Sequence, residues 1–319
     1  MVQESSTPMK IDILAEGLAF PEGPVALADG SVLVVEIAAG RLTRVAPGGR
    51  CEVLADIGGG PNGAALGPDG ACYVCDGGGY EWHRHADGTL HPGLQPAGYA
   101  GGRIVRVDLA GGAVRTLYTH SDKAPLKGPN DLVFDADGGL WFSDLGKRRA
   151  RDMDHGAICW ARIDGSECRE VIHPMTTPNG VGLSPDGRRL YVAETGPGRL
   201  WAFDIAGPGR IARAPDSPAP HGGTLVAGLP GYRMFDSLAV EADGRICVAT
   251  LHDGGITVVS PSGDAVEHVP MPDRFATNLC FGGADLRTAF VTLSSTGRLA
   301  AAAWPRPGLP LHFQQRDGL

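Results

Sequence analysis

The sequence of 319 residues contains few aromatic side chains, no excess of basic residues and no long apolar run. Aromatic residues make up 6% of the chain, and 28 Lys and Arg stand against 36 Asp and Glu, which gives a formal net charge of -8. Nucleic acids and anionic membranes both select clustered Lys and Arg, so neither is expected as a main partner. No apolar stretch approaches the roughly 20 residues that span a bilayer. We therefore expect a soluble protein that acts on a small molecule, in an oligomeric state that the sequence leaves open.

Several local signatures are also missing. Seven cysteines are an odd number without the spacing of a disulfide framework, and the N-terminal stretch MVQESSTPMKIDIL lacks the basic and apolar regions of a secretory signal. We therefore expect a cytoplasmic protein with mostly reduced thiols. Cys72 and Cys75 form a C-x-x-C pair, but at this spacing on a strand they point to opposite faces, which disfavours a joint metal or redox site. No G-x-S-x-G elbow supports a serine hydrolase triad.

The sequence is rich in glycine and proline, and it contains a repeat. With 48 Gly, 25 Pro and 43% hydrophobic residues, the composition is typical of a globular fold with many tight turns. An acid or an amide recurs seven positions before an aspartate that opens a turn. The six pairs are Glu22 and Asp29, Asn62 and Asp69, Asn130 and Asp137, Asn179 and Asp186, Asp236 and Asp243, and Asn278 and Asp285. Glycine follows the aspartate in the first five pairs, and Leu286 follows it in the last. Six copies indicate a repeat architecture.

Each copy has the pattern of a meander of short strands around its turn. Successive copies start 40, 68, 49, 57 and 42 residues apart, which suits four-stranded propeller blades with variable loops. The sequence thus predicts an all-β, six-bladed β-propeller over residues 10–305. The sixth copy supplies only three strands, so we expect residues 10–14 to pair as its outer strand and close the ring. Residues 1–9 and 306–319 match no repeat and are expected to form a flexible N-terminus and a C-terminal tail.

The six starting residues should surround the mouth of the central channel, because each stands where the inner strand of a blade begins. These ring residues are Glu22, Asn62, Asn130, Asn179, Asp236 and Asn278. The second strands return to the same level, which predicts a further set on this rim: Glu36, Asp76, Asp144, Glu194 and His252. Carboxylate and amide oxygens are ligands of a hard divalent cation, Ca²⁺ before Mg²⁺ or Mn²⁺. The alternative is that they only cap loop backbone, as Asn and Asp do in many proteins.

The stretches FPEGPV, GPNDLVFDADGGLWFSDLG, TPNGVGLSPDGRRLYVAET and FDSLAVEADGRICVAT carry a specific resemblance when taken together. They resemble the family of senescence-marker-protein, gluconolactonase and regucalcin-like hydrolases, which includes lactonases and the squid-type diisopropyl fluorophosphatase. The resemblance covers most of the chain, and it implies a six-bladed propeller with one catalytic divalent ion at one end. Carried over motif by motif, the implied ligands are Glu22, Asn130, Asn179 and Asp236. The implied ion is Ca²⁺, with Mn²⁺, Mg²⁺ or Zn²⁺ as the other options.

The chemistry that this resemblance implies is the hydrolysis of a cyclic ester. The ion would polarise the lactone carbonyl, and Asp236 would act as general base on water or as nucleophile. The chain departs from the family pattern twice: Ser237 follows Asp236 in place of glycine, and Gly128, beside Lys127, stands where sugar lactonases often carry an arginine. We therefore expect a small lactone with few hydroxyl groups. The alternatives on the same site are hydrolysis of another ester or a phosphoester, a lyase or isomerase step, and a non-catalytic metal-binding propeller.

A long insertion in the second copy, residues 75–102, carries aromatic residues suited to substrate contact, and we expect it to form a lid or a pocket wall. His252 should lie next to Asp236, where it could donate a proton to the leaving alkoxide or serve only as a hydrogen-bonding loop residue. The residues expected to contact substrate are Asn62, Tyr80, Trp82, Lys127, His252 and Asn278. His83 and His85 form an H-x-H pair, but without acidic neighbours a second metal is not expected.

Overall fold

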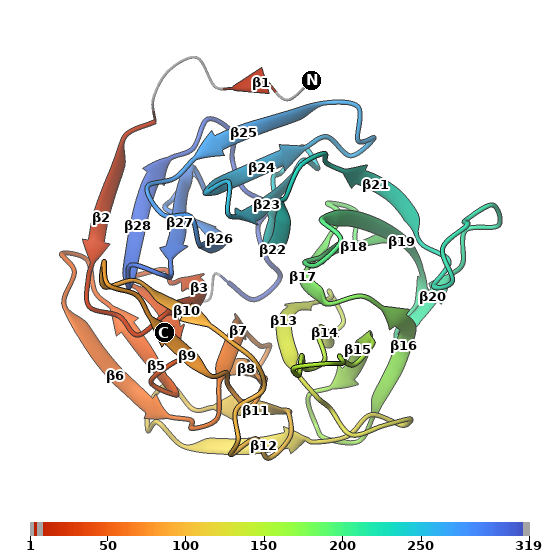
Figure 1. Ribbon diagram of the computed structural model, residues 1–319, viewed down its shortest axis with the longest axis horizontal. Helices are drawn as coiled ribbons and strands as arrows, with labels where there is room; N and C mark the ends of the chain where they lie inside the picture. The colour runs from red at the N-terminus through yellow and green to blue at the C-terminus, as the bar shows by residue number, and fades with distance from the viewer. Residues whose placement is uncertain (1–2, 5–8, 315–319) are drawn as a thin grey trace.

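Six β-sheets stand like blades around a central axis in the computed structural model, which describes residues 3–4 and 9–314 (Figure 1). In each sheet one strand lies nearest the axis, and the three strands that follow it outwards form an antiparallel meander. The described residues form no helix, and accordingly none of them belongs to a helix long and apolar enough to cross a membrane. The predicted all-β, six-bladed architecture is confirmed.

The strands follow the repeats seen in the sequence. The first blade consists of β3 (Pro21–Ala26), β4 (Val32–Glu36), β5 (Arg41–Val45) and β6 (Cys51–Asp56). The second consists of β7 (Pro61–Leu66), β8 (Cys72–Asp76), β11 (Arg103–Val107) and β12 (Val114–Tyr118). The third consists of β13 (Pro129–Phe134), β14 (Gly139–Asp144), β15 (Gly156–Arg162) and β16 (Cys168–Met175).

The remaining blades carry small additions to this plan. The fourth consists of β17 (Pro178–Leu183), β18 (Arg189–Glu194), β19 (Arg199–Gly207) and β21 (Thr224–Gly228), with the short β20 (Arg210–Ala212) also on β19. The fifth consists of β22 (Met234–Val240), β23 (Ile246–Leu251), β24 (Gly255–Val259) and β25 (Val266–Pro270), with β1 (Gln3–Glu4) along its edge. The sixth consists of β26 (Ala276–Gly282), β27 (Thr288–Leu293), β28 (Arg298–Ala303) and β2 (Ile11–Ala15). The last of these strands pairs antiparallel with β28, with Ile11 opposite Ala302.

The core lies between neighbouring blades, so both faces of the strands near the axis are buried. The whole of β4, sequence VLVVE, is buried, as expected for a strand that is covered on both sides. Trp141 and Ile158 of the third blade pack in one cluster with Val192 and Phe203 of the fourth. Burial of such side chains contributes roughly 1.5–3 kcal/mol each, and it fixes the blades relative to one another.

The Asp-Gly turns lie at one end of the ring, and they require a left-handed backbone. The glycines that follow the turn aspartates have positive φ values: 83° at Gly30, 77° at Gly70, 81° at Gly138, 67° at Gly187 and 90° at Gly244. In the sixth copy Leu286 takes the same conformation, with φ 55°. Its side chain is buried in the core of the sixth blade, and this burial offsets the backbone cost of a side chain in that region.

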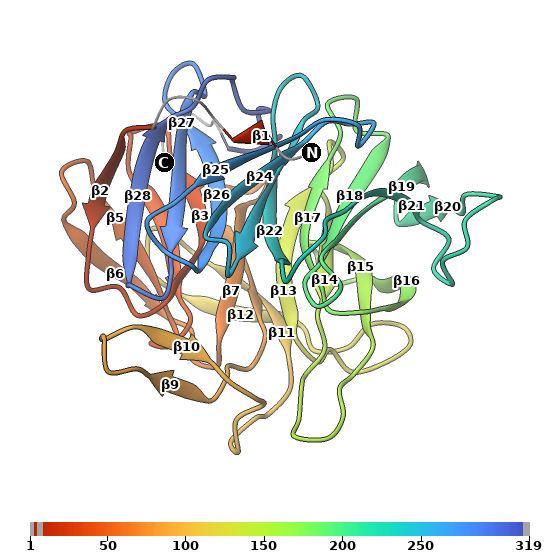
Figure 2. The ribbon, with the colours of Figure 1, turned by 45° about the horizontal axis from the view of Figure 1, so that its top comes forward.

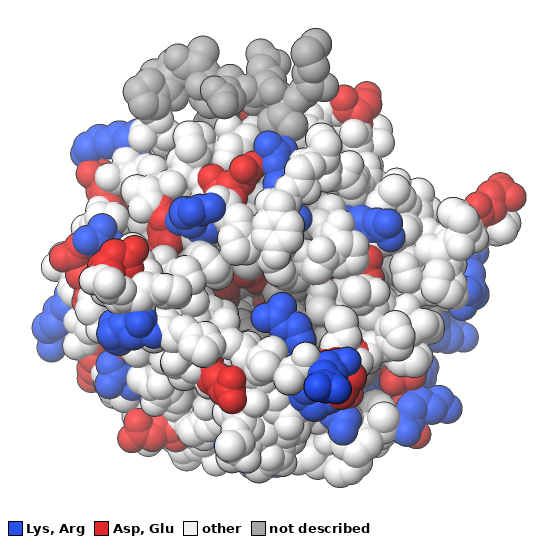
Figure 3. Space-filling view, in the orientation of Figure 1, with Lys and Arg blue, Asp and Glu red and all other residues white. Residues whose placement is uncertain are grey.

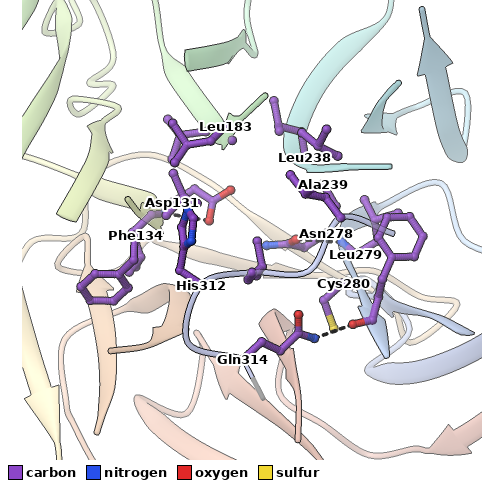
Figure 4. Close-up of a pocket in the computed structure, with 18 of the residues that line it drawn as sticks. Asp131, Phe134, Leu183, Leu238, Ala239, Asn278, Leu279, Cys280, His312 and Gln314 are labelled. Carbon is purple, nitrogen blue, oxygen red and sulfur yellow. Dashed lines mark hydrogen bonds between the residues drawn. The ribbon is translucent and has the colours of Figure 1, made fainter. Parts of the chain in front are cut away.

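The chain beyond the sixth blade crosses the ring at the turn end. The Leu309 amide donates to the Val240 carbonyl at 2.8 Å, and Gln314 Nε2 donates to the Phe281 carbonyl at 2.5 Å. Residues 309–312 and Gln314 border a cavity of about 110 Å³ between the inner strands, which Asp131 and Asn278 also line (Figure 4). Residues 306–314 of the predicted tail are therefore packed against the propeller, and residues 315–319 lie outside the described residues.

Candidate functional site

A larger pocket, of about 480 Å³, opens at the other end of the ring. Five of the six predicted ring residues line it: Glu22, Asn62, Asn130, Asn179 and Asp236. Figure 3 shows the centre of this face hollowed, with acidic side chains within the hollow and basic side chains beside it. The predicted common level of the six starting residues thus brings five of them into one pocket.

A shift in strand register places these side chains. In the first five blades the pairing of the inner strand with its neighbour is irregular at or directly after the ring residue. Such a bulge bends the strand and re-aims the side chain at that position. In the sixth blade the shift comes earlier, between Ala276 and Asn278. Asn278 lines the cavity at the turn end, and its Nδ2 donates to Glu22 Oε2 at 2.7 Å.

Hydrogen bonds hold the ring side chains by their amide nitrogens. Asn179 Nδ2 donates to Asp236 Oδ1 at 2.6 Å and to Thr195 Oγ1 at 3.0 Å. Glu22 Oε2 also accepts from the Gly23 amide at 2.6 Å. Asn130 Oδ1 is the one buried side-chain nitrogen or oxygen of the described residues that has no hydrogen-bond partner. A buried carbonyl oxygen without a partner is costly, so this oxygen is free to accept from or coordinate a ligand.

Three carboxyl groups whose charges interact lack a basic partner: Glu22 and Asp236 in this pocket, and Asp131 in the cavity at the turn end. Burial raises the pKa of Glu22, and burial together with the charge of Glu22 raises the pKa of Asp131 to about 8. The pKa of Asp236 is raised well above its usual value by desolvation and then by Glu22. None of the three carboxylates takes part in a salt bridge within residues 9–314. A cation bound between them would relieve this mutual repulsion.

The donor set fits a hard divalent cation. Glu22, Asn130, Asn179 and Asp236 offer two carboxylates and two amide oxygens in one pocket, which is the ligand chemistry of Ca²⁺. The part of the chain that the structure describes contains no group of three or more His, Cys, Asp and Glu that could hold a metal. A metal at this mouth would therefore need the amide oxygens as well as the carboxylates.

The second predicted set of acids does not line the pocket. These carboxylates point into the loops, where each accepts a hydrogen bond from a backbone amide just ahead of an inner strand. The donors are Ala19 to Glu36 at 2.8 Å, Gly60 to Asp76 at 2.7 Å, Gly128 to Asp144 at 2.6 Å and Thr176 to Glu194 at 2.6 Å. The expectation that these side chains line the rim is corrected, because they position the loops that carry the ring residues. Only His252 of this set lines the pocket.

The insertion in the second blade forms one wall of the pocket. It contains the hairpin of β9 (Trp82–Arg84) and β10 (Leu90–Pro92), which lies at one end of the ring in Figure 2. Its backbone reaches two other blades, since the Leu90 amide donates to the Ser295 carbonyl and the Gln95 amide to the Arg148 carbonyl, both at 2.9 Å. Tyr80 and residues 91–95 line the pocket. Trp82 does not, and it packs against Phe20 at 5.1 Å between ring centroids.

A row of rings continues the pocket wall from the hairpin. His91 of the hairpin packs on Phe275 at 4.4 Å, Phe275 on His252 at 5.3 Å, and His252 on Tyr232 at 5.1 Å between ring centroids. Desolvation lowers the pKa of His252, with the charge of Arg274 adding to the effect. Imidazole and aromatic faces on this side suit contact with apolar parts of a ligand.

A family model described as the SMP-30/Gluconolactonase/LRE-like region matches residues 20–295. The chain belongs to this family. Lactonase drp35 of Staphylococcus saprophyticus is 29% identical to it over 145 residues, which are 46% of this chain and 42% of the relative. Lactonase drp35 of Staphylococcus aureus is 26% identical over the same share of each chain. The chain thus spans less than half the length of these curated relatives.

Solved structures of the same fold include two with related names. A gluconolactonase from Xanthomonas campestris has a TM-score of 0.72 and 23% sequence identity, covering 93% of this chain and 90% of that one. A calcium-binding protein, regucalcin, from Agrobacterium tumefaciens has a TM-score of 0.71 and 18% identity, covering 98% and 100%. At these identities the likeness shows the fold.

In this member of the SMP-30/Gluconolactonase/LRE-like family, the basic residues of the pocket come from the loop after β14 and not from Lys127. Lys127 does not line the pocket, and its backbone carbonyl accepts a hydrogen bond from the Tyr99 hydroxyl at 2.6 Å. Lys147 and Arg148, in the loop after β14, do line it. Lys147 Nζ donates to the Gly79 carbonyl at 2.7 Å and lies 4.6 Å from the centre of the Tyr80 ring.

Burial lowers the pKa of Lys147 to about 8. The sequence signal that could have pointed to this residue is the run Lys147-Arg148-Arg149, which follows the second strand of a blade on the mouth side.

Proposed function

We propose that this protein is a divalent-metal-dependent lactonase that opens a small cyclic ester. The observation that carries the proposal is the pocket of Glu22, Asn130, Asn179 and Asp236, with acids that lack a basic partner and the unpartnered Asn130 oxygen. Membership of the family and the lactonase names of the relatives support the lactone as substrate class. Ca²⁺ is the first choice of ion, because every donor is a hard oxygen.

The four side chains would hold the ion, and the ion when bound would act as a Lewis acid on the lactone carbonyl. The residues around it have separate tasks. Asn179 Nδ2 fixes Asp236 through Oδ1 at 2.6 Å, so the carboxylate stays oriented at the pocket. Held there, Asp236 would take the proton of an attacking water, or it would attack the carbonyl carbon itself. His252 lies in the same pocket and would relay to the leaving alkoxide oxygen the proton that Asp236 has taken from water, accepting it on one ring nitrogen and donating from the other.

The proposal also takes β2 as the strand that closes the ring. Its pairing with β28 supports this, since it joins the start of the chain to the last blade. Closure matters for the site because Asn278 of the sixth blade donates a hydrogen bond to Glu22 of the first blade. The two residues remain in contact only if the first and sixth blades remain side by side.

The test is pH-stat hydrolysis of aliphatic and sugar lactones by protein freed of metal with chelator and then supplied with Ca²⁺, Mn²⁺, Mg²⁺ or Zn²⁺. We expect turnover that returns with one ion and that Asp236→Asn lacks. Metal binding is measured separately by calorimetry with Asn130→Ala, which should weaken it. Metal binding without lactone turnover would favour other esters, phosphoesters or lyase substrates. Absence of metal binding would refute the metal assignment.

A single turnover in ¹⁸O-labelled water separates the two roles of Asp236. If Asp236 acts as base, the label enters the first product molecule. If it acts as nucleophile, the first product carries ¹⁶O from the carboxylate, and the label stays on the protein.

A further inference from the structure

The pocket of the proposed lactonase would carry a net positive charge once the proposed ion is bound. Its charged lining residues are Glu22, Asp236, Lys147 and Arg148, whose formal charges cancel. Desolvation lowers the pKa of both His91 and His252, which disfavours a positive charge on these rings. With a divalent ion on the carboxylates, the occupied pocket has a surplus of two positive charges. Ring opening develops one negative charge, so a neutral lactone would leave one cation without a counter-charge.

Arg148 is the side chain placed to use that surplus. Its neighbour Arg149 pairs with Asp154 at 3.0 Å and also with Asp152. Arg148 makes no salt bridge to any acid among residues 9–314, and its side chain lines the pocket. Its backbone is fixed by a bridge to Met153 and by the bond from Gln95 to its carbonyl. Arg148 therefore combines a held backbone with an exposed side chain that has no acidic partner, at the lining of the pocket.

Lys147 strengthens the positive character of this side. It is 3% exposed, and the Gly79 carbonyl is the one hydrogen-bond acceptor of its ammonium group among the described residues. Its ammonium group makes no salt bridge among residues 9–314, although the charges of Asp76, Asp144 and Asp154 act on it, and a buried ammonium of this kind is unusual in a structural role alone. Tyr80 lines the same pocket as Glu22, Asp236 and Arg148. Burial, and then the charges of Asp236 and Glu22, raise the pKa of its hydroxyl, and the charge of Arg148 opposes this.

We propose that Arg148, supported by Lys147, binds a carboxylate on the substrate, and that the protein acts on lactones that carry one. This inference rests on the proposed function and names its substrate class. The planar guanidinium matches a carboxylate in a bidentate pair. One carboxylate and one developing oxyanion together balance the surplus of two charges, whereas a phosphate dianion would exceed it.

The experiment compares two lactones that share a five-membered ring: γ-butyrolactone and its 4-carboxylate derivative, γ-carboxy-γ-butyrolactone. The methyl ester of the second compound serves as the neutral isostere. With metal-loaded protein we expect kcat/KM for the carboxylate to exceed that for the ester by about 10- to 100-fold, with the ratio falling as salt is added. Arg148→Gln should reduce the ratio to near one, and Arg148→Lys should restore part of it. Arg151→Gln, in the same loop but outside the pocket lining, should leave the ratio unchanged.

The outcomes separate the two proposals. Equal hydrolysis of carboxylate and ester, or a ratio that survives Arg148→Gln, would overturn the carboxylate site and leave the lactonase standing. If no lactone is hydrolysed, the proposed function fails, and binding of γ-carboxy-γ-butyrolactone by saturation-transfer NMR still decides the site. Binding that Arg148→Gln abolishes would support it, and absent or unchanged binding would refute it.

Discussion

Asp144 and Asp236 carry the same carboxylate at the same end of the ring, yet their surroundings give them different roles. Asp144 accepts hydrogen bonds from the amides of Lys127, Gly128 and Gly146. Asp236 lines the pocket and faces the charge of Glu22. The first arrangement satisfies a carboxylate within the loop, and the second leaves one ready for a cation. The neighbouring backbone decides whether a carboxylate anchors a loop or faces the pocket, and no local sequence pattern predicts this.

Asp144→Asn tests the loop-anchoring role. An amide can accept with one end only, so at least one of the backbone donors would face an NH₂ group. We expect a loss of about 2 kcal/mol in the free energy of unfolding, measured by urea denaturation. Asp137→Asn is the control, because this exposed turn aspartate makes no side-chain hydrogen bond among the described residues, and its change should stay within about 0.5 kcal/mol. Equal stability of the two variants would contradict the assignment.

Lys147 should make stability depend on pH in the alkaline range. Its pKa is lowered to about 8 from 10.5, so between these values the unfolded chain binds more protons than the folded protein. Stability contributed through this residue therefore rises with pH across that window. The difference in unfolding free energy between wild type and Lys147→Met should increase by on the order of 3 kcal/mol from pH 8 to 10.5. Exposed Lys123, replaced in the same way, provides the baseline, and a flat difference would rule out a buried ammonium.

At the scale of elements, the turn after each inner strand sets the start of the next strand. Its glycine adopts a conformation that costs other residues roughly 1–2 kcal/mol. Gly187 isolates this cost, since a Cβ there would meet nothing within 4 Å and its φ is 67°. Gly187→Ala should lower the unfolding free energy by about 1 kcal/mol. Gly111→Ala, at an open position without a positive φ, should change it by less than about 0.5 kcal/mol, and equal losses would show that the turn geometry is not responsible.

The parts of the fold that could be predicted from the sequence are those governed by spacing along the chain. The seven-residue interval from Asn179 to Asp186 covers one strand and its turn, so six repeats predict six blades and a common level for their first residues. The register shifts could not be predicted, and neither could the earlier shift that turns Asn278 to the other cavity. Lys147 and Arg148 line the pocket from a loop outside the repeat. The spacing of the repeats therefore does not predict their position.

At the scale of the whole molecule, the first described long strand and the last belong to one sheet. A chain that starts at residue 16 would lack β2 and leave the edge of β28 unpaired. We expect this chain to lose several kcal/mol of unfolding free energy and to expose more apolar surface, which ANS binding would report. A chain that starts at residue 9 keeps β2 and should remain within about 1 kcal/mol of the full chain. Similar stability for both truncated chains would show that β2 does not hold the ring.

The bond between Asn278 and Glu22 joins residues 256 positions apart, and this separation has a consequence for synthesis. At roughly 5–20 residues per second, Glu22 leaves the ribosome about 10 to 50 seconds before Asn278 is made. During that interval the first blade has its polar ring residue but no sixth blade beside it, and β2 has no partner strand. Long-range contacts of this kind form late and slowly. The mouth of the propeller is therefore completed only after nearly the whole chain has been synthesised, and a nascent protein would gain the proposed metal affinity in one step at the end.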